Sequence, residues 1–200
     1  MPRRPCYVNG VACRWLALTS STAGLLASCA SAEPAGIAGA AALDAGSGPA
    51  PLTVAESWSL ADPAEDPFAP EAVGRVSCTS AAYRTEGTWL EVTTTTCNYA
   101  SFVSVFPSEV PAGSKIRGEL AWATLAALAP AVGTLAFATQ ADLLWSHEVP
   151  IPGLADLVQV EFEVPERLAT GSALYFHVRN HGYNSWQLGP LTLERPPAGN

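Results

Sequence analysis

The densest group of chemically active side chains lies in residues 174–186, which read LYFHVRNHGYNSW. Because the side chains of a β-strand alternate between its two faces, Tyr175, His177 and Arg179 share one face if the apolar residues between them face a core. Together they offer an aromatic plate, an imidazole and a bidentate donor, which are groups that bind a sugar, a carboxylate or a phosphate. The sequence therefore predicts a ligand-binding face on this strand.

The loop that follows adds polar groups to the same predicted site. Asn180, His181, Tyr183 and Asn184 lie beside the strand and are included among the candidate ligand-binding residues. The alternative is that the two asparagines and Gly182 only supply the turn geometry between two strands.

The histidines could also bind a metal ion or take part in catalysis. His177 and His181 are four residues apart, a spacing that puts two side chains on one face of a helix but does not guarantee that they converge in a strand followed by a hairpin loop. The sequence has no GxSxG, HExxH or GxxxxGK[ST] motif. We therefore predict no metal, cofactor or catalytic residue, and we keep a small envelope hydrolase using residues 177–184 as the alternative.

The elements that would position these residues are β-strands. Apolar residues alternate with polar ones in several short runs separated by turn residues, which is typical of an all-β sandwich or barrel. We predict a single antiparallel β-sandwich with Trp122 and Trp145 packed in its core. The expected strands are residues 89–96, 102–106, 115–122, 134–139, 143–149, 158–164, 173–179 and 185–193.

The amino terminus has the layout of a secretory signal peptide. Arginines at positions 3, 4 and 14 precede a mostly apolar stretch, residues 15–28, which is too short to span about 30 Å of hydrocarbon. The stretch ends in Leu26-Ala27-Ser28-Cys29, which resembles the lipobox of bacterial lipoproteins. The resemblance implies cleavage before Cys29, lipid on its sulfur, and placement at the outer membrane as an exported lipoprotein. An ordinary secretory signal with a cysteine near its end is the alternative.

Three segments follow from this interpretation: a signal peptide at residues 1–28, a lipid anchor and flexible linker rich in Ala, Gly and Pro at 29–56, and the sandwich at 57–198. We expect the acidic residues 57–71 to form a solvated entrance to the domain. The chain has 18 acidic and 10 basic residues, and cleavage removes three of the arginines, so the mature net charge is about −11. Such a surface repels polyanions and argues against a nucleic-acid partner.

The domain contains two cysteines, Cys78 and Cys97, out of five in the chain. In an exported protein, where thiols are oxidised, we expect them to form a disulfide bond. Two free thiols or a metal pair are the alternatives.

The order of the predicted strands and the aromatic-bearing final strand are similar to the jelly-roll sandwiches of noncatalytic carbohydrate-binding modules. The resemblance implies that an exposed aromatic ring, here Tyr175 or Tyr183, stacks on a sugar. We expect a binding or structural module of the cell envelope, anchored to the membrane by lipid, with a glycan or an envelope protein as its partner. Docking of an assembly partner on a sheet edge at residues 93–96 is a further possibility.

Overall fold

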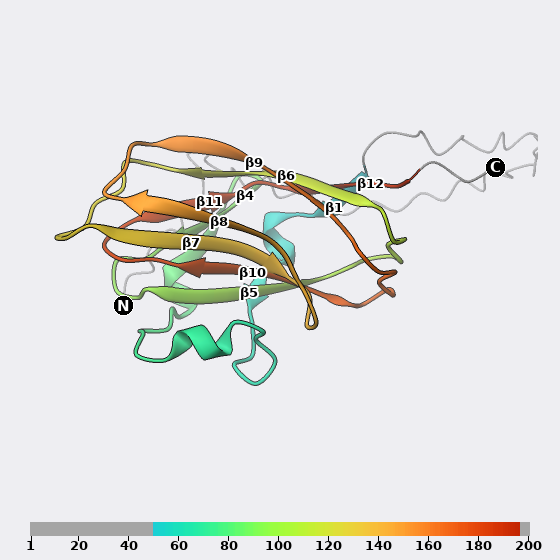
Figure 1. Cartoon of the computed structure of the whole chain (residues 1–200), viewed down its shortest axis with the longest axis horizontal. Helices are drawn as coiled ribbons and strands as arrows, with labels where there is room; N and C mark the ends of the chain where they lie inside the picture. Colours follow the sequence, from blue (N-terminus) through green and yellow to red (C-terminus); the bar gives the residue numbers. More distant parts are fainter. Residues whose placement is uncertain (1–49, 197–200) are drawn as a thin grey trace, which may run out of the picture. The chain divides into compact units, whose positions relative to one another are not determined.

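The computed structural model describes residues 50–196, which form two stacked antiparallel β-sheets (Figure 1). The predicted single β-sandwich is therefore confirmed. The predicted signal peptide, the lipobox with Cys29 and most of the predicted linker lie outside the described residues. No helix among the described residues combines the length and apolar character needed to cross a bilayer.

The first sheet has seven strands in the order β1-β12-β6-β11-β4-β3, and β9 pairs along the whole of β6. Strand β6 is bordered by β12 along its first half and by β11 along its second half. The strands of this sheet are β1 (Ala50–Thr53), β3 (Tyr83–Glu86), β4 (Trp89–Thr93), β6 (Lys115–Trp122), β9 (Asp156–Glu163), β11 (Ser185–Leu188) and β12 (Leu191–Glu194).

The second sheet has five strands in the order β2-β5-β10-β7-β8. Its central strand β10 carries the predicted ligand-binding triplet and pairs with β5 on one side and β7 on the other. The strands of this sheet are β2 (Ser59–Leu60), β5 (Tyr99–Val105), β7 (Ala131–Ala138), β8 (Leu143–Ile151) and β10 (Ala173–Arg179).

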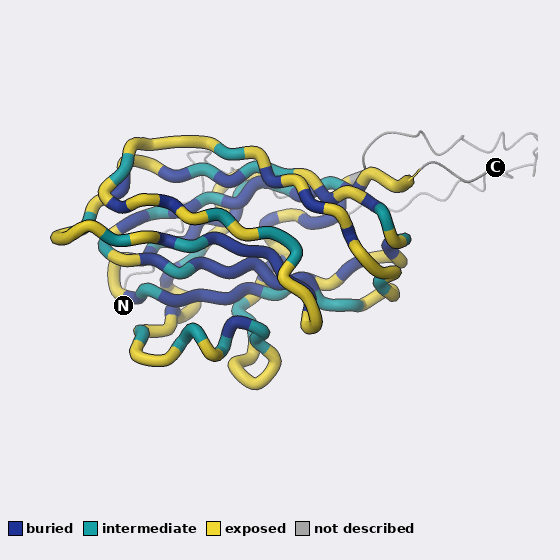
Figure 2. The backbone as a smooth tube through the Cα atoms, in the orientation of Figure 1, coloured by how far each residue is buried: buried dark blue, intermediate teal, exposed yellow. Residues whose placement is uncertain are grey.

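The alternating pattern places one side of each sheet in the core. Phe102, Phe137 and Phe176 come from β5, β7 and β10, are fully buried, and stack with ring centroids 5.1–6.2 Å apart. From the opposite sheet, Phe162 of β9 packs on Phe137 at 5.5 Å. Trp122 is buried as predicted, and Trp145 is partly buried against the same core. Figure 2 shows this burial along the central strands of the second sheet.

The strand predicted at residues 185–193 is divided into β11 and β12 by Gly189 and Pro190. Proline has no N–H to donate to a ladder, so the regular pairing breaks there. The N–H of Gly189 still donates to the carbonyl of Glu119 (2.9 Å), which keeps both strands on β6.

The sandwich begins earlier than the predicted boundary at residue 57. Residues 50–53, which composition assigned to the linker, form β1 and pair with β12. The short 3-10 helix η1 (Ala55–Ser57) follows, and Leu52 and Ala55 are buried in the core. These residues show no alternating pattern because β1 is too short, and its pairing with β12 is what makes it a strand.

Candidate functional site

The predicted binding face of β10 lies on the outer side of the second sheet, as expected, but it is covered. We call residues 61–76, which contain the 3-10 helix η2 (Ala69–Ala72), the strap (Figure 1). The strap lies over the outer face of β5, β10 and β7, where Phe68 packs in a small second core with Tyr99 and Tyr175. This contradicts the predicted solvated entrance at residues 57–71, because Phe68 and Trp58 are both buried.

His177 lies fully buried beneath the strap. Its ring stacks on Phe68 with centroids 4.4 Å apart, and its Nδ1 lies 3.1 Å from the hydroxyl oxygen of Ser101. Its Nε2 has no hydrogen-bond partner and lies 3.9 Å from a carboxylate oxygen of Glu71. Burial outweighs the nearby Asp66 carboxylate and lowers the pKa of His177 to about 4, so the imidazole is neutral at pH 7.

The other two members of the triplet also have partners within the protein, although Arg179 is partly exposed. Arg179 donates one hydrogen bond to Glu71 of the strap (3.0 Å) and another to Thr134 of β7 (2.8 Å). Tyr175 is buried, and its hydroxyl donates to the side-chain oxygen of Gln140 (2.9 Å). Tyr175, His177 and Arg179 therefore share a face as predicted, but the expectation that this face is open to a ligand is wrong.

The charge pair between strap and sheet gives a first prediction. Glu71→Gln removes the ion pair with Arg179, and we expect the free energy of unfolding to fall by about 1 kcal/mol, since both partners are partly exposed. Urea denaturation measures the change. Glu65→Gln, at an exposed position of the same strap, is the control, and an equal loss in both variants would contradict a specific role for the pair.

An open pocket of about 440 Å³ lies instead at one end of the sandwich. Three loops line it: residues 94–98 between β4 and β5, 126–128 between β6 and β7, and 181–183 between β10 and β11, together with Val76 at the end of the strap. We call this site the end pocket. It collects three of the large apolar side chains exposed on the described surface, Val76, Leu128 and Tyr183, and Tyr183 is 72% exposed.

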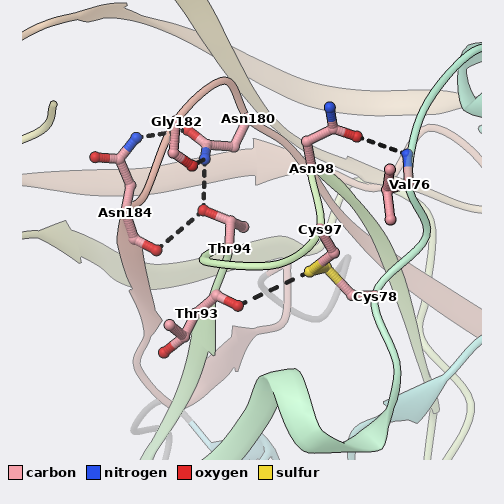
Figure 3. The surroundings of a disulfide bond; sticks show 9 residues. All are labelled: Val76, Cys78, Thr93, Thr94, Cys97, Asn98, Asn180, Gly182 and Asn184. Atoms are coloured by element: carbon pink, nitrogen blue, oxygen red, sulfur yellow. Dashed lines mark hydrogen bonds between the residues drawn. A yellow bond between two sulfur atoms is a disulfide. The ribbon is translucent and has the colours of Figure 1, made fainter. Parts of the chain in front are cut away.

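Polar side chains accompany these apolar ones. Thr95, Thr96 and His181 line the end pocket and are exposed, and Asn98 is half-buried. The side-chain oxygen of Asn98 accepts from the N–H of Val76 (2.9 Å), and its nitrogen points away from that contact (Figure 3). Of the predicted ligand-binding residues, only His181 and Tyr183 therefore lie at an open pocket.

Asn180 and Asn184 are buried and hold the three loops together. The amide of Asn180 donates to the hydroxyl of Thr94, which in turn donates to the backbone oxygen of Asn184 (3.0 Å; Figure 3). The side chain of Asn184 donates to the Asn180 oxygen (2.9 Å) and accepts from the N–H of Ala126 (2.8 Å). Turn geometry, the simpler of the two interpretations, thus accounts for both asparagines.

The predicted disulfide bond between Cys78 and Cys97 is present, with Cα atoms 5.0 Å apart. It joins the segment that follows the strap to the 94–98 loop (Figure 3). Cys97 also lines the end pocket. On the other side of the disulfide, Cys78 lines a smaller hollow of about 250 Å³ between strap and sheet. The disulfide therefore fixes one wall of the end pocket.

The predicted docking edge needs correction, and one loop of the end pocket was not predicted. The Thr93–Thr96 run is not a sheet edge, because β4 ends at Thr93 and lies between β11 and β3. Thr94, Thr95 and Thr96 instead line the end pocket. Residues 126–128 were not among the candidates, since an alanine-rich stretch carries no chemical signal.

Within residues 50–196, no group of three or more His, Cys, Asp or Glu side chains is arranged to hold a metal ion.

No protein-family model matches the sequence, and no curated protein matches it either. Solved structures with a related arrangement of strands include the K3 cleaved adhesin domain of Lys-gingipain from Porphyromonas gingivalis, with 12% identity, a TM-score of 0.43, and 70% of this chain and 92% of that chain covered.

Two carbohydrate-binding modules are also similar. TmCBM61, solved in complex with beta-1,4-galactotriose, has 14% identity and a TM-score of 0.37 over 61% of this chain and 81% of that chain. The C-terminal CBM6 of LamC from Zobellia galactanivorans has 14% identity and a TM-score of 0.39 over 57% and 89%. The match to PfGH50B covers only 22% of that longer chain. These values assign no ligand to this chain.

Proposed function

We propose that this protein is a noncatalytic, lipid-anchored binding protein of the cell envelope, and that its end pocket binds a sugar. The observation that carries the proposal is the exposed ring of Tyr183 at a pocket of about 440 Å³ lined with hydroxyl and amide groups. The volume falls within the range of about 300–1,000 Å³ that is usual for small-molecule sites.

The chemistry of the lining suits a sugar ring. A pyranose has apolar C–H faces, which pack on an aromatic plate such as Tyr183, and hydroxyl groups, which need hydrogen-bond partners. Thr95, Thr96, Asn98 and His181 supply such partners around the same pocket. A large exposed aromatic ring is costly in water and is favoured at binding sites.

The envelope location rests on the sequence and on the disulfide. Cys29 in its lipobox-like setting would carry the lipid that holds the protein on the outer membrane, with the linker between the anchor and the sandwich. The bond between Cys78 and Cys97 supports export, since disulfides form and persist in oxidising compartments.

Binding is favoured over hydrolysis by the position of His177. This histidine meets both a hydroxyl, in Ser101, and a carboxylate, in Glu71, which a hydrolase would need. His177 is fully buried, however, and lines neither the end pocket nor the hollow between strap and sheet, so no substrate reaches its imidazole in this arrangement, although Ser101 lines that hollow. Of the other two histidines, His147 is half-buried on β8, and His181 is exposed and lines the end pocket.

Replacing Tyr183 tests the proposal. We expect Tyr183→Ala to weaken sugar binding at least tenfold, about 1.4 kcal/mol, with an unchanged melting temperature because the ring is mostly exposed. Tyr183→Phe keeps the plate and should keep most of the affinity. A glycan array selects the ligand and calorimetry measures its affinity.

Leu143→Ala, which removes an exposed apolar side chain on β8, is the matched control. Undiminished binding by Tyr183→Ala would exclude the end pocket as the sugar site. Absence of any bound glycan for the native protein would refute a sugar-binding function.

A further inference from the structure

The described lining of the end pocket carries no fixed charge. Among the described residues that line it, none is Asp, Glu, Lys or Arg. Its polar groups are the hydroxyls of threonine and tyrosine, the amide of Asn98 and the imidazole of His181. These groups satisfy the hydroxyls of a ligand but do not neutralise a carboxylate, sulfate or phosphate.

The cations nearest in sequence are engaged elsewhere. Arg75 precedes the pocket residue Val76, but its Nε donates to the backbone oxygen of Glu71 (3.1 Å) within the strap. Arg179 lies two residues before His181 and is bound to Glu71 and Thr134 beneath the strap. Neither guanidinium is among the groups that line the pocket.

The net charge of the whole protein also disfavours an anionic ligand. The chain has a net charge of −8 at pH 7, so an anionic glycan is repelled during its approach. Moving a carboxylate out of water is costly unless a partner charge or several donors compensate, and the mostly apolar wall of Val76, Leu128 and Tyr183 offers none. Repulsion during the approach and the cost of moving the carboxylate out of water therefore both disfavour an anionic glycan.

We infer that the end pocket selects uncharged sugars and discriminates against the corresponding uronic acids. The inference rests on the proposed sugar-binding function and specifies its ligand class. The selectivity arises because the described pocket wall holds no cation, and not from the shape of the sugar ring, since a hexose and its uronic acid share that ring.

Matched pairs of methyl glycosides test this directly with the full chain: glucoside and glucuronide, galactoside and galacturonide, mannoside and mannuronide. Calorimetry is done at pH 8, where a histidine imidazole ordinarily carries no charge. For each pair in which either member binds, we expect the neutral member to bind at least tenfold more tightly. Equal or tighter binding of the uronide overturns the inference and leaves the proposed function intact. No binding in any pair, or on an array of longer glycans, overturns both.

An added cation separates charge from other causes of selectivity. Thr95→Lys places an ammonium group at the exposed edge of the pocket, and we expect it to reduce the preference for the neutral sugar to about threefold or less. Gln159→Lys adds the same charge on the exposed face of β9, at a position that does not line the end pocket, and should leave the preference unchanged. A preference that stays at tenfold in Thr95→Lys, with neutral-sugar binding retained, would overturn the inference.

Discussion

Gly182→Ala is expected to lower the free energy of unfolding by about 4 kcal/mol and to abolish ligand binding at the end pocket. Gly182 has φ of +103°, which side-chain-bearing residues rarely adopt. A Cβ built there would lie 2.2 Å from the backbone oxygen of Ala126, a group that cannot rotate away. The loop at residues 126–128 would therefore have to move, and with it Leu128 and one wall of the pocket.

Gly171→Ala is the matched control for this substitution. Gly171 also has a positive φ, +82°, but no atom lies within 4 Å of its hypothetical Cβ. This variant thus measures the cost of backbone strain alone, about 1–2 kcal/mol, and should bind ligand normally. Chemical denaturation and calorimetry on both variants separate strain from collision. If both variants have similar stability and both bind ligand, the 126–128 loop accommodates the added methyl group without a loss of stability or affinity, which would contradict the prediction.

The strands that the sequence predicted well are those with long alternating runs. In β9, Val160 and Phe162 face the core while Gln159 and Glu161 face solvent, so the period of two is unmistakable. Strands β1, β2 and β3 were missed because they have two to four residues and, in β3, a mostly polar sequence. Their conformation is set by pairing with distant strands, which local pattern does not encode.

The candidate site was predicted less completely for a related reason. The alternation in β10 correctly placed Tyr175, His177 and Arg179 on one face, but a pattern within one strand does not show what covers that face. The cover is an irregular segment about 110 residues earlier in the chain, where Phe68 stands alone among acidic residues. The end pocket was missed as a unit because it combines three loops, and only the 181–183 loop carried residues with evident chemistry.

Acidification is expected to destabilise the domain by about 3 kcal/mol through His177 alone. In the unfolded chain a histidine has a pKa of about 6.5, whereas burial lowers the pKa of His177 in the folded protein to about 4. Above pH 6.5 the imidazole is neutral in both states, so it adds no pH dependence. Between pH 6.5 and 4 only the unfolded state binds the proton, and the free energy of unfolding falls by about 1.4 kcal/mol per pH unit. Below pH 4 both states are protonated and the loss levels off.

The contribution of His177 is isolated by comparing variants, since carboxylates also titrate in acid. Urea denaturation from pH 8 to 3.5 on the native protein, His177→Gln and His181→Gln gives the three curves. His177→Gln is expected to lose stability at pH 7, because the stacking on Phe68 is weakened, but to fall by about 3 kcal/mol less than the native protein between pH 7 and 4. His181→Gln removes an exposed histidine and should follow the native curve. Because the strap covers the His177 ring, lifting the strap lets water solvate the imidazolium, so we expect protonation to open the contact between strap and sheet first. Hydrogen exchange corrected for intrinsic rates should therefore show the amides of Ala69 and Glu71 losing protection at a higher pH than those of β10, and simultaneous loss would instead indicate that strap and sandwich unfold as one unit.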